Sequence, residues 1–242
     1  MSAGPGSLPR FMQWSPAGRG LVFVLAAASI WCLLAEMYRL CDMRTFTLWI
    51  LVPATVVLYG WAALDRVRGD GRLFRAVMIG TVGGLIGAAA YDLFRLPFVF
   101  SRAWGLEAAG VPQMPLFKVF PRFGALILGQ PVEQASYSLA AQLIGWGYHL
   151  SNGATFGVMF AAVIGEARGR YGGGWLWAVL MAVGIEACLL LSPYTGFFGI
   201  PMTPRFVAVT LTAHVIFGVG LGVWFAWQSR AWVAPGRVAA AA

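Results

Sequence analysis

Charged residues are scarce in this sequence. Only 11% of its 242 residues are Asp, Glu, Lys or Arg, whereas 60% are hydrophobic. An ordinary soluble domain is roughly a quarter charged. Apolar stretches recur along the whole length at the roughly 20 residues that a helix needs to cross a bilayer. The sequence therefore predicts an all-α integral membrane protein with no soluble catalytic domain large enough to act alone.

Several kinds of motif are also missing. The three cysteines form no CxxC pair and lie in or beside apolar segments, so no disulfide framework is expected. We find no phosphate-binding loop, nucleophile elbow, zinc-protease helix or nucleotide fingerprint. Hydrolase or ATPase activity within this chain is therefore not expected, and the sequence leaves open whether the protein is an enzyme.

The excess of basic residues has an explanation other than nucleic-acid binding. The formal net charge is +8, and Lys118 is the only lysine. The cations cluster at the ends of apolar stretches, where membrane topology and lipid headgroups account for them. We expect the lipid bilayer as a partner and no nucleic acid. Other membrane subunits and a homo-oligomer are the alternatives for protein partners.

The apolar stretches predict six helices, at about residues 20–38, 46–64, 73–95, 138–165, 173–192 and 206–228. Together they predict a six-helix transmembrane domain over 20–228. An N-terminal cytoplasmic segment (1–19) precedes it and a C-terminal cytoplasmic tail (229–242) follows. Pro53 is expected to kink the second helix. The first helix is expected to stay uncleaved, because no convincing small-residue cleavage site precedes Arg39.

One long connection, residues 96–135, separates the third and fourth helices. Five prolines break it, and aromatic residues are interleaved with them. It is too broken to span a bilayer and too apolar for a simple solvated loop. We expect it to lie along the membrane interface or to cap the bundle.

Counting cationic residues predicts the orientation. With the N-terminus inside, ten lie in inner segments and seven in outer ones, and the densest cluster is DRVRGDGRLFR (65–75). This distribution favours cytoplasmic termini in a multi-pass plasma-membrane protein, for which we expect a bacterial inner membrane. The long connection then faces outward.

Five ionisable residues lie inside the predicted spanning helices and not at their ends. They occupy five different helices, and each lies on a stripe of small residues spaced four apart: Glu36, Asp92, His149, Glu186 and His214. A charge in hydrocarbon costs at least roughly 2.5–3.5 kcal/mol near the bilayer centre. Because small stripes are where membrane helices approach most closely, these side chains are expected to point into the bundle. Distances along the helices place all five in the outer half of the membrane.

A short pattern recurs in the fourth and sixth helices. GYHLSNGATFG (147–157) and TAHVIFGVGLG (212–222) share H-x3-G-x3-G, and each follows a helix with a carboxylate near its outer end. We interpret helices three–four and five–six as two diverged, parallel copies of a helical pair.

Three functions remain open for the polar cluster. The working hypothesis is a membrane subunit that binds a metal through the five residues, or a b-type haem through His149 and His214. The second is a small transporter of protons, ions or a polar solute. The third is a structural or assembly subunit in which the polar groups are only interhelical hydrogen-bond partners.

One segment offers a further site. YDLFRLPF (91–98) places Tyr91, Asp92 and Arg95 at an outer helix end, just before a proline. These residues either bind an anionic headgroup or quinone, or form an interfacial anchor with an intrahelical ion pair.

Overall fold

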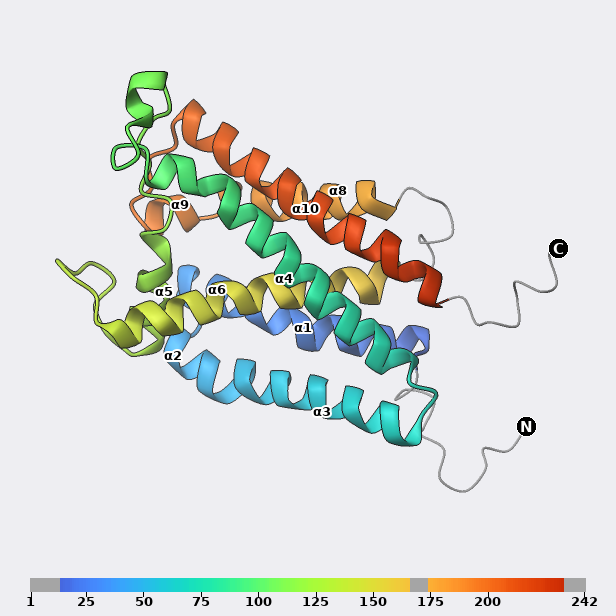
Figure 1. The fold of residues 1–242 in the computed structure, drawn as a ribbon. Coiled ribbons are helices and arrows are strands. Elements are labelled where there is room, and N and C mark those ends of the chain that lie inside the picture. The colour runs from blue at the N-terminus through green and yellow to red at the C-terminus, as the bar shows by residue number, and fades with distance from the viewer. Residues whose placement is uncertain (1–13, 166–173, 233–242) are drawn as a thin grey trace.

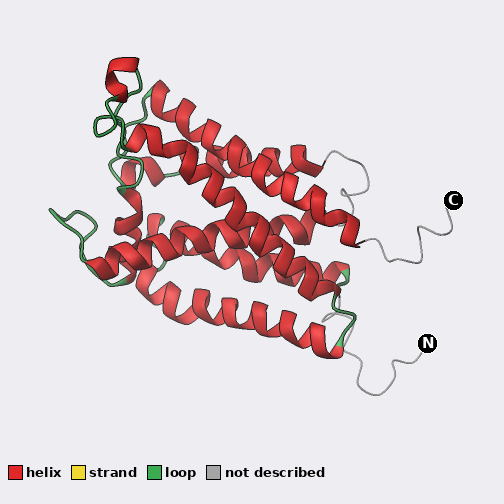
Figure 2. Cartoon of the chain, in the orientation of Figure 1, coloured by secondary structure: helices red, strands yellow, loops and turns green. Residues whose placement is uncertain are grey.

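The computed structural model describes residues 14–165 and 174–232, and every regular element in these ranges is helical (Figures 1 and 2). Five helices are long and apolar enough to cross a membrane, which is the organisation of a multi-pass membrane protein: α1 (Pro16–Met37), a helix over Met43–Arg68, α4 (Arg72–Val99), α8 (Gly174–Leu191) and α10 (Pro204–Trp232, apolar over Pro204–Gln228). Five of the six predicted helices are thereby confirmed as candidate spans.

The sixth predicted helix is present as α6 (Leu139–Phe160), which continues into a π-helical turn, η4 (Ala161–Gly165). It has 22 residues but is not among the candidate spans. Gln142, His149, Ser151 and Asn152 lower its hydropathy, and no such row of polar residues occurs in α1 or α8.

The long helices run side by side between two ends of the molecule (Figure 1). At the turn end, residues 69–71 join α3 (Val52–Arg68) to α4. At the loop end lie residues 38–42, 100–138 and 192–203, with the short helices α2 (Met43–Phe46), η3 (a 3-10 helix, Leu106–Ala109), α5 (Val119–Ile127) and α9 (Tyr194–Phe197). The first residues of α1 and the last of α10 lie at the turn end. Residues 1–13 and 233–242, and the predicted inner arginines Arg168 and Arg170, lie outside the described residues.

Two prolines lie within long helical stretches. Pro53 lies at the start of α3, directly after a π-helical turn, η2 (Thr47–Leu51), in which Val52 N–H donates to Thr47 O. The wider turn accommodates a residue that has no N–H to donate. Pro97 lies inside α4, which continues to Val99 instead of ending at residue 95 as predicted.

Small residues form the contacts between the long helices. A Cβ on Gly84 would lie 2.0 Å from the carbonyl oxygen of Gly153, and one on Gly157 would lie 2.0 Å from that of Gly80. A Cβ on Gly218 would lie 2.4 Å from Val179 Cα in α8. The glycines of both H-x3-G-x3-G patterns therefore lie where α6 crosses α4 and where α10 crosses α8, as expected for close helix packing in membranes.

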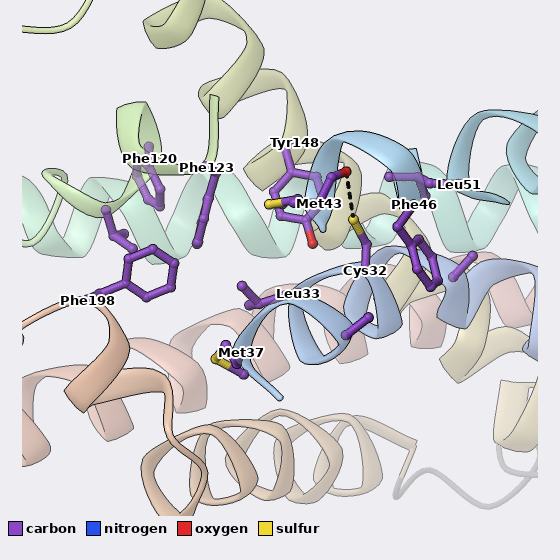
Figure 3. Close-up of a cluster of buried hydrophobic side chains, with 13 residues drawn as sticks. Cys32, Leu33, Met37, Met43, Phe46, Leu51, Phe120, Phe123, Tyr148 and Phe198 are labelled. Carbon is purple, nitrogen blue, oxygen red and sulfur yellow. Dashed lines mark hydrogen bonds between the residues drawn. The ribbon is translucent and has the colours of Figure 1, made fainter. Parts of the chain in front are cut away.

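The connection 96–135 contains a helix that the sequence did not predict. α5 packs against the first half of α6 so closely that a Cβ on Gly124 would lie 1.8 Å from the carbonyl oxygen of Ala141. Its rings Phe120 and Phe123 join a buried apolar cluster with side chains from α1, α2 and α6 and with Phe198 (Figure 3). In the same cluster Cys32 Sγ donates to the carbonyl oxygen of Met43.

Candidate functional site

A cavity of about 490 Å³ lies at the loop end, walled by α1, α4, α5, α6, α8, α9 and α10 and by the loop segments beside α5 and α9. Its size is that of small-molecule sites, which usually occupy 300–1,000 Å³. The predicted site residues Tyr91, Arg95, His149, Glu186 and His214 all line it, and Asp92 contacts two of them. The structure therefore brings together six of the seven residues singled out from the sequence.

The first polar pair joins α4 to α6. His149 Nε2 lies 2.9 Å from Asp92 Oδ2, and because a carboxylate only accepts, this nitrogen donates. The Phe120 ring is stacked on the imidazole, with ring centroids 4.0 Å apart. The α4–α6 crossing places Asp92 opposite His149, two turns beyond Gly84 and one turn before Gly153 respectively.

The second polar pair joins α8 to α10 and is looser. His214 Nδ1 lies 3.5 Å from Glu186 Oε2 and 2.9 Å from the carbonyl oxygen of Thr210 on its own helix. A carbonyl only accepts, so Nδ1–H donates to Thr210. Glu186 is buried, with 5% of its surface exposed.

Tyr91 lies between the two pairs. Its ring centroid is 6.0 Å from that of His149 and 4.9 Å from that of His214, in an edge-on contact with the latter. Four ionisable side chains from four helices thus meet around one tyrosine. Periodicity placed each of them on an inward face, but only the packing of the helices shows which of them are neighbours.

Arg95 is the most deeply buried cation of the site, with 3% of its surface exposed. Nη1 lies 3.3 Å from Asp92 Oδ1, and Nη2 donates to the carbonyl oxygen of Leu116. Its guanidinium carbon lies 4.5 Å from the centre of the Tyr91 ring and 5.3 Å from that of Phe120. The intrahelical ion pair expected from the sequence is present, but it faces a cavity and not the membrane surface.

Glu36 does not reach the cavity. It accepts a hydrogen bond from the backbone N–H of Met43 and so caps the short helix α2. Asp42 caps the same helix by accepting from Thr45 N–H at 2.8 Å, and this hydrogen bond lowers the pKa of its exposed carboxyl group. Glu36 lies at a helix end, where a carboxylate satisfies backbone donors that have no intrahelical partner.

The predicted metal centre is not supported. Within residues 14–165 and 174–232, no three His, Cys, Asp or Glu side chains converge in a way that could hold a metal ion. The physical reason is that the five residues divide into two separate histidine–carboxylate pairs and a helix cap. A b-type haem is not supported either. His149 Nε2 is already directed at Asp92, and Tyr91 is packed against both imidazoles.

The sequence did not single out several other residues of the cavity. Arg122 and Phe120 come from α5, Asn152 from α6, and Tyr194 from α9. Burial raises the pKa of Tyr194, so its hydroxyl remains a neutral donor. Asn152 lies three residues after His149 and therefore on a neighbouring part of the same helix surface. This spacing was the one feature of the sequence that could have identified it as a site residue.

In comparisons with protein families, with curated proteins and with solved structures, nothing matches this chain.

Proposed function

We propose that this protein is a small membrane transporter that moves a polar solute through the loop-end cavity together with protons. The observation that carries the proposal is the convergence of Asp92–His149 and Glu186–His214 on Tyr91, at the wall of a cavity large enough for a small molecule. Transporters place ionisable residues in such intramembrane cavities.

Proton coupling follows from the composition of the two pairs. Histidine is the side chain whose charge ordinarily changes near neutral pH, and each of the two histidines lies beside a carboxylate. The charged and titratable groups that contact the two imidazoles or line the same cavity come from α4, the turn before α5, α5, α8, α9 and α10: Tyr91, Asp92, Arg95, Lys118, Arg122, Glu186, Tyr194 and Arg205. A solute that alters the charge balance among these groups changes how strongly the pairs hold protons.

The packing alternative explains the two pairs but not the cavity. Hydrogen bonds between membrane helices need only the paired side chains, and they contribute about 0.6 kcal/mol each. Protein interiors are otherwise close-packed, with few voids larger than a water molecule. A hollow of this size beside buried ionisable groups favours a binding site over an assembly role.

The finer membrane assignments are proposed on the same basis. We take α6 as a sixth spanning helix, because it runs beside α1 and α4 and carries one half of the first pair (Figure 1). We take α4–α6 and α8–α10 as diverged copies of one helical pair, with a carboxylate on the first helix and a histidine on the second. The loop end is placed outside and both termini in the cytoplasm, in a bacterial inner membrane, as cation counting suggests.

The surface of the molecule suits lipid. In the Met43–Arg68 helix, large apolar side chains stand exposed in a row: Leu48, Trp49, Ile50, Val52, Val56 and Val57. We place this face against the bilayer, and it is also where a second copy or another membrane subunit has room to pack.

Purified protein in liposomes with a lumenal pH dye tests the proposal. A panel of one anionic, one cationic, one zwitterionic and one neutral polar solute, none of which crosses bilayers unaided, is added outside. The wild type is expected to move protons when at least one solute is present. Glu186→Gln is expected to abolish this, while Glu107→Gln, an exposed carboxylate outside the cavity, retains it. Equal proton movement in Glu186→Gln, or none above protein-free liposomes, contradicts the proposal.

A further inference from the structure

Unpartnered hydrogen-bonding atoms gather at the loop-end cavity. Among the described residues, four buried side-chain nitrogen or oxygen atoms have no hydrogen-bond partner, and three belong to residues that line it: Arg95 Nε, Arg122 Nε and Asn152 Oδ1. Buried polar atoms are normally paired, so each exception calls for an explanation. All three belong to residues of one cavity, so a ligand bound there would lie beside each of them.

In both arginines each Nη atom already has an acceptor in the protein, whereas the Nε atom has none. Both Nη atoms of Arg95 are engaged, by Asp92 and by the carbonyl oxygen of Leu116. Both Nη atoms of Arg122 are engaged as well, by Glu133 and by the carbonyl oxygen of Phe198. The guanidinium groups are thereby fixed in place, and the Nε–H of each is a charged donor without an acceptor in the protein. Fixed donors with positive charge favour an oxyanion.

The charge balance of the wall points the same way. Four cations line the cavity, namely Arg95, Lys118, Arg122 and Arg205, against the single carboxylate Glu186. Arg95 and Arg122 are ion-paired, whereas Lys118 and Arg205 are exposed and form no ion pair within the described part of the chain. These two exposed cations of the cavity lining attract an anion and repel a cation.

The remaining wall is apolar. Phe120, Phe123, Phe156, Phe206 and Phe217 contribute rings to it, along with aliphatic side chains. An inorganic ion leaves most of these walls without contact, while an apolar group attached to the anion fills them. Ligand pockets commonly combine such walls with a few placed polar groups.

We propose that the loop-end cavity binds a small organic oxyanion with an apolar body, whose head accepts hydrogen bonds from the Nε–H groups of Arg95 and Arg122. This inference rests on the proposed function, because it names the class of solute that the transporter carries. The same chemistry is offered by a free aromatic acid and by the head of an anionic lipid.

Binding in detergent tests the inference without requiring transport. The probe is benzenesulfonate, which stays anionic across the working pH range, and its matched neutral counterpart is benzenesulfonamide. Titration calorimetry on the full chain is expected to show benzenesulfonate binding at least about tenfold more tightly than the sulfonamide, since a hydrogen bond to a charged group contributes that much. Inorganic sulfate is expected to bind more weakly than benzenesulfonate as well.

Conservative variants locate the site. Arg122→Lys and Arg95→Lys keep the charge but remove the Nε–H, so each is expected to weaken benzenesulfonate binding by about tenfold. The control is Arg102→Lys, an exposed arginine of the same end that lies outside the cavity, and it is expected to bind like the wild type. Arg122→Lys decides the question if Arg95→Lys fails to fold, because Arg122 is only partly buried.

Three results overturn the inference: equal binding of sulfonate and sulfonamide, unchanged binding in the folded lysine variants, or no binding of benzenesulfonate, phenyl phosphate and benzoate alike. Displacement of benzenesulfonate by dioctanoyl phosphatidate identifies a lipid headgroup as the source of the oxyanion, and its absence identifies a soluble acid. If benzenesulfonate binds but no proton flux occurs in liposomes, the transport proposal is refuted and the oxyanion site is not. If proton flux occurs only with cationic or neutral solutes, the oxyanion inference is refuted and transport is not.

Discussion

The two histidine–carboxylate pairs share a sequence pattern but differ in how firmly they are held. Asp92 and His149 lie 2.9 Å apart, with Phe120 stacked on the imidazole and Arg95 bound to the same carboxylate. Glu186 and His214 lie 3.5 Å apart, and His214 is bonded instead to its own helix. The difference suggests a division of labour, in which the first pair is a fixed anchor beside Arg95 and the second exchanges protons with the solute.

Removing the two carboxylate charges separately is expected to give the largest contrast. Asp92→Asn leaves the buried guanidinium of Arg95 without its counter-ion, and breaking a buried pair in this way costs about 3–5 kcal/mol. Glu186→Gln removes only a weak interhelical contact, for which about 0.6–1.7 kcal/mol is expected. Unfolding by sodium dodecyl sulfate in mixed micelles measures both, with Glu107→Gln as the control. If Glu186→Gln lowers the free energy of unfolding more than Asp92→Asn does, the first pair is not the more firmly held one.

Forcing apart the two helices that carry each pair is expected to cause the next largest loss of stability. A Cβ on Gly84 meets the backbone of α6, and one on Gly218 meets the backbone of α8. Such overpacking typically costs about 1–3 kcal/mol. Gly84→Ala is expected to disturb the signals of His149 most, and Gly218→Ala those of His214, in nuclear magnetic resonance spectra of the labelled rings.

The matched controls for these two variants are Gly147→Ala and Gly184→Ala, where nothing lies within 4 Å of the added Cβ. Both are expected to be neutral or slightly stabilising, because alanine is favoured over glycine inside helices by about 0.5–1 kcal/mol. If the control variants destabilise the protein as much as Gly84→Ala and Gly218→Ala do, the close helix crossings are not what positions the two pairs.

Removing the stacked ring from the first pair is expected to have the smallest effect. Phe120→Leu loses an aromatic contact with His149, which is worth about 0.5–1.5 kcal/mol. In this variant the ring resonances of His149 are expected to shift, while those of His214 stay in place. Phe123→Leu is the control, because this neighbour in α5 packs on Tyr148 and Phe198 instead. A shift of both histidines, or of neither, argues against a Phe120 ring that, of the two histidines, contacts His149 alone.

Much of the fold could be predicted because it depends on local composition. A helix that crosses a bilayer needs a long apolar stretch, and the predicted bounds of the six long helices agree with the structure to within about four residues. Proline was the main source of error. Pro97 did not end α4, and α5 was hidden among prolines and aromatic residues in a connection that appeared too broken for a buried helix.

The candidate site could be predicted only in part. The small-residue stripes correctly placed Asp92, His149, Glu186 and His214 on inward faces, since close approach of membrane helices requires small side chains. Which residues pair depends on the order of the helices around the bundle, and periodicity does not encode that order. Glu36 shows the limit most clearly, because its stripe also faces inward, yet its carboxylate caps α2.

The proposed transport function requires the two pairs to form one proton-linked site around Tyr91. His149 and His214 are the only histidines in the chain. Labelling histidine with ¹⁵N therefore gives two sets of ring resonances, which His149→Gln assigns. Interacting groups titrate as a pair, so we expect the pH titration of His214 to shift when His149 or Asp92 is replaced. A titration of His214 that is identical in the wild type and in both variants would show that the two pairs are not linked.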